Sequence, residues 1–162
     1  MSVAFTKDED HEAAAANLPD RPISPHLNLV TAQGLADLEA AYARSKAAYT
    51  AAKASGDINE NRTAMARATR DLRYYTARRA SAQLVEPVTN PDRVVFGCTL
   101  TVQREDGRCQ TFRIVGEDEA DPKTGTLSYV SPLARALQGR EIGDTVQVSG
   151  ASVEVTALSY EK

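Results

Sequence analysis

The sequence has no tryptophan, and aromatic residues make up only 6% of its 162 residues. Because so few large rings cannot fill one extensive aromatic core, we expect an elongated architecture with a small globular part. No apolar run approaches the ~18 residues of a transmembrane helix, so no membrane span is expected. The N-terminus lacks the basic and apolar stretches of a secretory signal, and the predicted localisation is therefore cytoplasmic.

Cysteine is also scarce, because only Cys98 and Cys109 occur. Two cysteines do not make a disulfide framework, and neither lies in a CxxC pair or at a Cys/His spacing that would bind zinc. His11 and His26 also lack a partner at metal-ligand spacing. We therefore predict no metal site of the chain's own and no cofactor of its own.

Residues 1–30 differ in composition from the rest of the chain. They contain an acidic run at residues 8–10, an alanine repeat at residues 13–16, and prolines at positions 19, 22 and 25. Proline at every third position favours an extended, polyproline-like backbone. We therefore predict a flexible, Pro/Ala-rich N-terminal arm over residues 1–30.

Two segments between residues 31 and 85 carry the spacing of a coiled coil. Thr31 is a good N-cap for the first segment, and Gly56 is a natural C-cap at its end. The seam positions are Leu35, Leu38, Tyr42, Ser45, Tyr49 and Ala52 in the first segment, and Ile58, Asn61, Met65, Ala68, Leu72, Tyr75, Arg79 and Ala82 in the second. Alternating steps of three and four residues predict an antiparallel coiled-coil hairpin over residues 31–85, about 39 Å long at ~1.5 Å per residue.

The turn between these two segments carries two carboxylates, Asp57 and Glu60. Their Asp-x-x-Glu spacing fits a capping box, in which Asp57 accepts hydrogen bonds from the first N–H groups of the second helix. A carboxylate held rigidly at the tip of a long arm also suits a group that assists a metal ion. The residues alone leave both interpretations open.

The second helix has an arginine-rich face. Arg67, Arg70 and Arg73 recur at three-residue spacing, which places them on one side of a helix. A solvated helix surface would explain this pattern. An electropositive stripe that faces nucleic acid or an acidic protein channel would explain it as well, and makes these arginines candidate nucleic-acid-facing residues.

A linker with two prolines at residues 86–91 precedes a segment with a period of two, residues 92–162. Its alternating apolar residues predict several short strands, and Ser131-Pro132 predicts the start of one short helix. We expect a small antiparallel sheet covered by that helix, so the whole chain belongs to the α+β class.

The first two of these strands meet at a turn that contains Asp106 and Gly107. We predict a three-residue loop over residues 106–108, because a two-residue loop would put the apolar residues of the two strands on opposite faces. The predicted register pairs Val102 with Phe112 and Leu100 with Ile114. It turns Cys98 inward and Cys109 outward, so no disulfide is expected.

An acidic loop at residues 117–121 holds four carboxylates in five positions. Carboxylates can bind a hard cation, but the spacing is not that of an EF-hand. The following Pro122-Lys123-Thr124-Gly125 is turn sequence. We favour a solvated loop over a cation site.

Several motifs point to a known family. They are Val94-Val95-Phe96-Gly97, Phe112-Arg113-Ile114-Val115-Gly116-Glu117-Asp118-Glu119-Ala120-Asp121, Ser131-Pro132-Leu133-Ala134-Arg135-Ala136-Leu137 and Gly143-Asp144, with Gly56, Asp57, Glu60 and Asn61 at the turn. Over roughly residues 31 to 160 these motifs resemble bacterial transcription elongation factors of the GreA/GreB type. The resemblance implies a coiled-coil hairpin followed by a C-terminal domain of FKBP-like fold.

The resemblance also implies a function. In that family the C-terminal domain docks at the rim of the RNA polymerase secondary channel and the coiled coil enters the channel. It implies that Ser131, Pro132 and Arg135 contact polymerase, and that a monomer acts on the DNA-bound transcription complex and, indirectly, on the RNA 3′ end. Asp57 and Glu60 would help to hold a Mg²⁺ shared with polymerase, so that the polymerase active site cleaves backtracked RNA. The chain would not be an enzyme itself and would at most assist that active site.

Two features depart from the family pattern. The family usually continues after the tip with alanine, glutamate and tyrosine, whereas this chain has Arg62, Thr63 and Ala64. Each helix is also shorter by about one heptad, which is about 10 Å at ~1.5 Å per residue and exceeds the range of metal coordination. Two functions therefore stay open, namely channel binding with stimulated cleavage and channel binding as a transcription regulator without cleavage activity.

The FKBP-like fold raises a third function, peptidyl-prolyl isomerisation. A fold does not by itself carry an activity, and an isomerase site of this type needs an aromatic-lined pocket. The C-terminal domain offers only Phe96, Phe112, Tyr129 and Tyr160 for such a pocket. We rank this function third.

Overall fold

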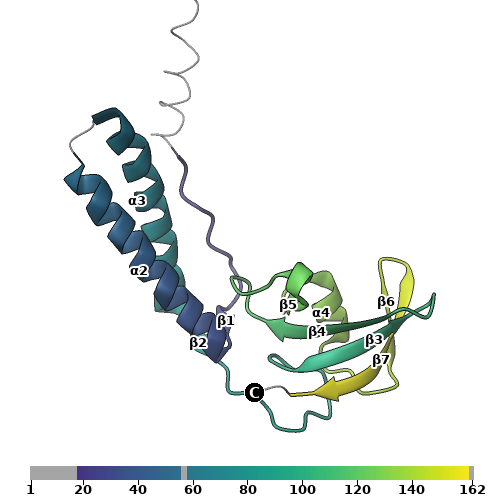
Figure 1. Ribbon diagram of the computed structural model, residues 1–162. Helices are drawn as coiled ribbons and strands as arrows, with labels where there is room; N and C mark the ends of the chain where they lie inside the picture. The colour runs from purple at the N-terminus through teal and green to yellow at the C-terminus, as the bar shows by residue number, and fades with distance from the viewer. Residues whose placement is uncertain (1–17, 56–57, 161–162) are drawn as a thin grey trace, which may run out of the picture. The chain divides into compact units, whose positions relative to one another are not determined.

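The computed structural model describes residues 18–55 and 58–160, without the side chains of residues 58–60 (Figure 1). Two helices come first along the chain, and a five-stranded sheet with a short helix follows. The chain divides into two compact units. One contains the described residues up to Pro25 together with Asp37–Ser81, and the other contains His26–Ala36 together with the residues from Ala82 onward. The predicted fold class, a helical hairpin followed by a sheet-plus-helix domain, is confirmed.

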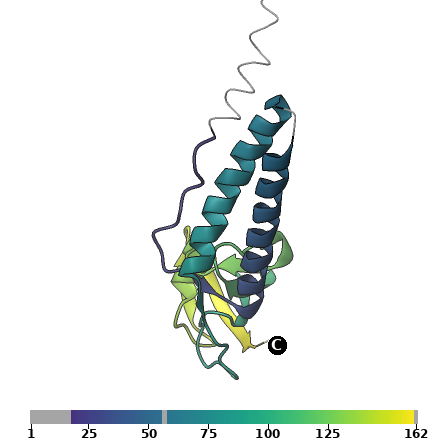
Figure 2. The same cartoon turned by 90° about the vertical axis from the view of Figure 1, so that its left-hand side faces the viewer.

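The two helices, α2 (Ala32–Ala54) and α3 (Ile58–Ser81), run side by side in both views (Figures 1 and 2). Their buried positions are mainly small or polar. They are Gly34, Leu38, Ala41, Ser45 and Ala52 on α2, and Ala68 and Arg78 on α3. The buried hydroxyl of Ser45 donates a hydrogen bond to the Ala41 carbonyl oxygen at 2.9 Å, so its own helix satisfies it. The seam is therefore narrow, and alanine fills much of it.

One seam position differs from the prediction. Arg79 was expected in the seam but is exposed, whereas Arg78 has only 2% of its surface exposed. An α-helix has 3.6 residues per turn and drifts against a strict seven-residue repeat, so the buried stripe moves by one residue over several turns. Arg79 instead forms an ion pair with Glu39 at 2.9 Å, and its guanidinium lies 4.5 Å from the centre of the Tyr42 ring.

Two short strands precede and follow the helices. Strand β1 (Leu29–Val30) pairs in parallel with β2 (Gln83–Leu84), and the Gln83 N–H donates to the Asn28 carbonyl oxygen at 2.8 Å. Leu29 and Val30 fall inside the segment predicted as a flexible arm, and β2 falls inside the predicted hairpin. Strands of two residues carry no readable periodicity, so the sequence did not reveal this pairing.

The sheet has the strand order β5-β4-β3-β7-β6. The strands are β3 (Thr99–Arg104), β4 (Cys109–Val115), β5 (Thr126–Ser128), β6 (Thr145–Val148) and β7 (Ala151–Ser159). A short helix, α4 (Pro132–Leu137), contributes Ala134 and Leu137 to the apolar core. The other buried members of this core are Val94, Cys98, Leu100, Val102, Ile114, Val146, Val153 and Val155.

The sheet is mixed rather than purely antiparallel as predicted. Strand β5 is parallel to β4, with Arg113 opposite Thr126. The chain leaves β4 at Val115, passes through the acidic loop and a 3₁₀ turn, η2 (Pro122–Thr124), and returns to the level of Arg113 before it pairs with the last three residues of β4. A connection that carries the chain back along a neighbouring strand makes the next strand parallel.

The predicted β3–β4 register is wrong by two positions. Leu100 pairs with Phe112 and Val102 with Gln110, because the three-residue loop covers residues 105–107. The Gly107 φ of +86° places glycine at the third loop position, where left-handed backbone is required. A shift of two keeps each side chain on its face, so Cys98 is buried, Cys109 is exposed and both thiols are free, as predicted.

Candidate functional site

The turn between α2 and α3 carries the two predicted catalytic carboxylates. Asp57 and the side chain of Glu60 lie outside the described residues. The α3 backbone begins at Ile58, directly after Asp57, and Glu60 is the third residue of the helix. A negative charge at the Glu60 position suits the first turn of a helix. The Asp-x-x-Glu spacing in the sequence fits a capping box. A catalytic role for Asp57 and Glu60 stays a prediction.

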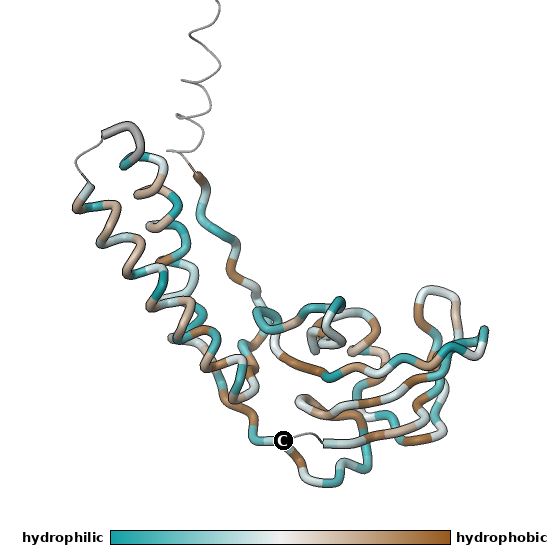
Figure 3. Tube along the Cα trace, in the orientation of Figure 1, coloured by the Kyte–Doolittle hydropathy of each residue, from teal (hydrophilic) through white to brown (hydrophobic). Residues whose placement is uncertain are grey.

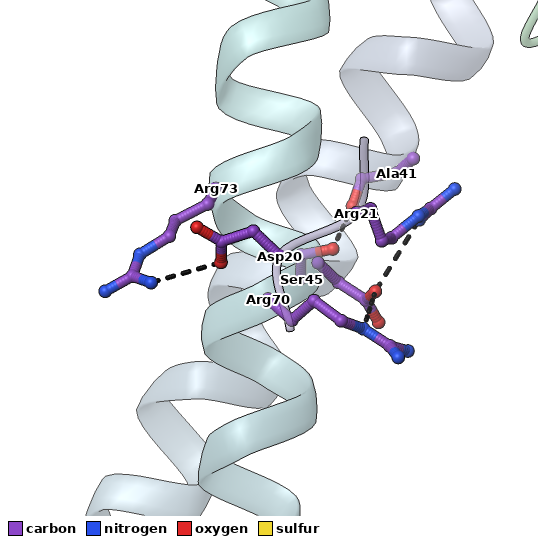
Figure 4. Close-up of polar contacts among 7 residues, drawn as sticks. Asp20, Arg21, Ala41, Ser45, Arg70 and Arg73 are labelled. Atoms are coloured by element: carbon purple, nitrogen blue, oxygen red, sulfur yellow. Dashed lines mark hydrogen bonds and ion pairs between the residues drawn. The ribbon is translucent and has the colours of Figure 1, made fainter. Parts of the chain in front are cut away.

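The predicted arginine face lies on α3. Arg67 is exposed and forms no ion pair with another described residue. The Nε atom of Arg70 lies 3.5 Å from the Asp71 carboxylate, outside hydrogen-bonding geometry. Arg73 forms an ion pair with Asp20 at 3.1 Å (Figure 4). The three arginines therefore differ, because only Arg73 is engaged by a residue from outside the two helices.

Residues 18–25 form an extended segment along α3, which we call the strap (Figures 1 and 2). The residues of the strap that are half-buried recur at every third position, and they are Leu18, Arg21 and Ser24. The prolines at positions 19, 22 and 25 are exposed. A polyproline helix has three residues per turn, so the proline repeat turns one row of side chains outward and another row toward α3.

Arg21 makes the closest contacts of the strap. Its guanidinium carbon lies 3.8 Å from the centre of the Tyr74 ring and 5.1 Å from that of Tyr75. A guanidinium nitrogen of Arg21 also lies 3.5 Å from the Asp71 carboxylate (Figure 4). Burial lowers the pKa of Arg21, but hydrogen bonding and charge interactions with Tyr75, Tyr74 and Asp71 raise it by more, so the guanidinium stays charged.

A groove of about 530 Å³ lies between the strap and α3. Leu18 and Asp20 line it from the strap, and residues of α3 line the rest; these are Asn61, Arg62, Met65, Ala66, Thr69, Arg70 and Arg73. Two buried polar atoms in its lining, Asn61 Oδ1 and Arg70 Nε, have no hydrogen-bond partner among the described residues. With three arginines and one aspartate, the groove is positively charged.

The predicted polymerase-contact residues surround the start of α4 in the sheet domain. The Ser131 hydroxyl oxygen accepts a hydrogen bond from the Ala134 N–H at 3.3 Å, and Pro132 is the first residue of the helix. Pro132 and Arg135 are exposed. Arg135 lies 3.3 Å from the His26 imidazole. The sequence-predicted N-cap is confirmed, and it leaves the proline and the arginine on the surface.

The acidic loop has a structural role. Glu119 accepts a hydrogen bond from the Thr31 hydroxyl at 2.6 Å, and the same hydroxyl oxygen accepts one from the Gly34 N–H at 3.0 Å. Asp121 caps η2 by accepting a hydrogen bond from the Lys123 N–H at 3.1 Å. Thr31 is thus the N-cap that the sequence predicted for α2, and the loop holds it. Within residues 18–55 and 58–160 no His, Cys, Asp or Glu cluster could hold a metal ion.

Sequence reasoning missed the strap contacts. Neither Asp20, Arg21 nor Tyr74 was singled out, although the three-residue proline spacing was noted. That spacing contained the signal, because it identifies positions 18, 21 and 24 as one row of side chains. Nothing in the sequence identified α3 as the element that this row contacts.

Comparisons with known proteins agree on one family. The family model described as "Transcription elongation factor, GreA/GreB, C-term" matches residues 88–160. Proteins named "Transcription elongation factor GreA" are similar to this chain. The protein of Verminephrobacter eiseniae is 39% identical over 126 residues, covering 70% of this chain and 80% of that protein. The protein of Desulfovibrio desulfuricans is 36% identical over 153 residues, covering 82% and 93%.

Among solved structures, the GreA factor homolog Gfh1 of Thermus thermophilus matches with a TM-score of 0.39 and 16% identity. The match covers 82% of this chain and 99% of that chain. None of the helices in the described part of this chain has the length and apolarity that crossing a membrane requires.

Proposed function

Since this chain belongs to the GreA/GreB family of transcription elongation factors, we propose that it binds RNA polymerase in the secondary channel. The single observation that carries this proposal is its similarity to GreA proteins over most of both chains. The helical hairpin would enter the channel, and the sheet domain would dock at its rim. The chain would act as a monomer in the cytoplasm, where polymerase transcribes.

The docking surface that we propose is the start of α4. Ser131 fixes the first turn of this helix by capping it, which holds Pro132 and Arg135 at the surface. A capped, proline-initiated turn loses little conformational freedom on binding, and an exposed guanidinium can pair with a carboxylate of the partner. Both properties suit a contact with polymerase.

We propose that Asp57 and Glu60 assist transcript cleavage at the hairpin tip. The Mg²⁺ that they would help to hold is shared with polymerase, and it supplies a polarised water for hydrolysis of a phosphodiester. The carboxylates of this chain would orient that water as hydrogen-bond acceptors. The chain has no active site of its own in this proposal and is not an enzyme.

The arginine face of α3 would lie toward RNA or the channel wall. Arg67, Arg70 and Arg73 occupy one side of the helix, and Arg67 is free of ion pairs with the other described residues. Arginines at this spacing neutralise phosphate charge without reading sequence. This supports a role in holding the RNA 3′ segment rather than in choosing it.

The second candidate function is channel binding that regulates transcription without cleavage. The observation that favours it is the sequence after the tip, where Arg62 and Thr63 replace the usual alanine and glutamate. The short hairpin favours it too, because α2 has 23 residues and is therefore only about 34 Å long at ~1.5 Å per residue.

Peptidyl-prolyl isomerisation remains the third candidate. The rings of Phe96 and Tyr129 pack edge to face at 5.6 Å, and together with Phe112 they are half-buried against the apolar core. Rings used in this way do not line an open pocket for a substrate proline. A protease-coupled peptide assay with clear isomerase activity would overturn this ranking.

Transcript cleavage in a reconstituted backtracked complex with the cognate polymerase tests the first function against the second. We expect Asp57→Ala/Glu60→Ala to lower the cleavage rate by ~10²-fold or more, as loss of a positioned catalytic group does. The matched control is Glu86→Ala/Asp92→Ala, which removes two exposed carboxylates in and next to the linker and should leave cleavage unchanged. Wild-type binding without any cleavage would establish the second function instead.

A further inference from the structure

The strap contacts two kinds of group on α3. Arg73 supplies a cation, and Tyr74 and Tyr75 supply aromatic rings whose centres lie 5.1 Å apart in an edge-to-face arrangement. Single-stranded nucleic acid is bound by groups of these two kinds, because arginine pairs with phosphate and aromatic rings stack on bases. Of these three residues, Arg73 also lines the positively charged groove.

The strap occupies both kinds of group at once. The Asp20 carboxylate pairs with Arg73 at 3.1 Å, in the way that a phosphate oxygen would. The planar guanidinium of Arg21 lies 3.8 Å from the Tyr74 ring centre, where a nucleobase would stack. Two adjacent residues of the strap therefore occupy one group that can bind a phosphate and one ring on which a base can stack, and Figure 4 shows the first of these contacts, Asp20 on Arg73.

A competing ligand can replace these contacts between the strap and α3. The side chains of Asp20 and Arg73 are 63% and 67% exposed, so water and salt screen their attraction. The strap carries one acidic and one basic residue, and a phosphodiester chain offers Arg73 a denser negative charge. The proline repeat also limits the conformations of a released strap, which lowers the entropic cost of docking it again.

We propose that this face of α3 binds single-stranded nucleic acid, with a phosphate on Arg73 and a base on Tyr74, and that residues 18–25 are a built-in competitor. The inference rests on the proposed nucleic-acid-facing role of α3 and names the groups that carry it. A strand binds fully only after it displaces the strap. The strap thereby restricts Arg73 and Tyr74 to partners that offer both phosphate and bases.

The test measures, by fluorescence anisotropy at low salt, how tightly the wild type and two variants bind a ten-nucleotide single-stranded RNA. Asp20→Ala/Arg21→Ala releases the strap without changing the net charge. We expect this variant to bind RNA about three- to tenfold more tightly than the wild type, the factor for a strap that covers the face ~70–90% of the time. The matched control, Asp106→Ala/Arg108→Ala, removes an exposed acid–base pair from the β3–β4 turn and should bind like the wild type.

A second variant tests the stacking. Tyr74→Leu in the strap-released chain should weaken RNA binding several-fold and leave binding of inorganic polyphosphate, which has no bases, unchanged. In the wild type, RNA should also shift the amide NMR signals of Tyr74 and Tyr75 toward their positions in Asp20→Ala/Arg21→Ala. Circular dichroism of each variant checks that α2 and α3 remain folded.

The outcomes separate this inference from the proposed function. Equal RNA affinity of the wild type and the strap-released chain overturns the competition. Equal loss of RNA and polyphosphate binding in Tyr74→Leu overturns the stacking. Absence of RNA binding in every chain overturns the nucleic-acid-facing role as well, whereas the cleavage assay reports on polymerase binding and the tip separately.

Discussion

The sheet domain buries ten apolar side chains in one cluster, whereas the described part of the helical hairpin buries three alanines, one leucine, one serine and one arginine. Figure 3 shows the same contrast, because hydrophobic residues recur along the strands while α2 and α3 are pale or hydrophilic over most of their length. Burial of large aliphatic side chains stabilises a fold far more than burial of alanine methyl groups. Stability is therefore concentrated in the sheet domain.

The helical hairpin and the sheet domain differ in what their surfaces and cores provide. A hairpin with a narrow seam leaves most of its surface for charged residues, and in the proposed function those residues face the channel. The compact unit of the sheet domain includes residues 26–36, and thus β1, Thr31 and the first turn of α2. Within this unit, the hydrogen bond from Thr31 to Glu119 and the β1–β2 pairing hold residues 29–31 in place.

The largest expected effect comes from breaking the sheet core. Ile114 is fully buried, so Ile114→Ala leaves a cavity and should cost about 3 to 4 kcal/mol of unfolding free energy. Urea unfolding followed by circular dichroism measures this. Ile142 is 59% exposed, so Ile142→Ala is the matched control and should stay within ~0.5 kcal/mol. Similar losses in both variants would contradict the assignment of the core.

A smaller effect is expected where the acidic loop meets β1. A Cβ atom on Gly116 would lie 2.3 Å from the backbone carbonyl oxygen of Leu29, so Gly116→Ala forces the backbone to move. We expect a loss of about 2 to 3 kcal/mol in the same urea experiment. In Gly34→Ala the new methyl group meets only side-chain atoms, those of Glu119 at 2.7 Å and Thr31 at 3.4 Å. Moving Glu119 weakens its hydrogen bond with Thr31, but alanine is a better helix former than glycine, so this control should change stability by less than ~1 kcal/mol. The reverse order would contradict the close approach at Gly116.

The smallest effect is expected in the hairpin seam. Ser45 is buried, but its hydroxyl bonds only to the Ala41 carbonyl oxygen of its own helix. Since alanine is the better helix former, Ser45→Ala should stabilise the chain by up to ~0.5 kcal/mol. Thermal unfolding monitored at 222 nm measures the change. A loss above ~1.5 kcal/mol would show that the seam depends on this hydroxyl and would weaken the contrast with the sheet core.

Much of the fold could be predicted from local patterns. Apolar spacing gave the two helices, period-two alternation gave strands β3, β4, β6 and β7, and Ser131-Pro132 gave the start of α4. The β4–β5 direction and the position of the β3–β4 loop could not be predicted in this way, because each depends on where a distant or shifted partner lies. The seam position of Arg78 depended on helix drift, which a strict heptad conceals.

In the candidate site, too, local sequence patterns identified some residues, and only the folded chain revealed others. The sequence identified the tip carboxylates Asp57 and Glu60, the arginines of α3 and the capped turn at Ser131, because each is a local pattern of residue types. It did not reveal that Asp20 pairs with Arg73 or that Arg21 lies over Tyr74, since each pair is separated by more than 50 positions. Sequence spacing fixes which side chains share a face, but only the folded chain decides which face meets another. The strap on α3 and the acidic loop on Thr31 are therefore products of tertiary structure.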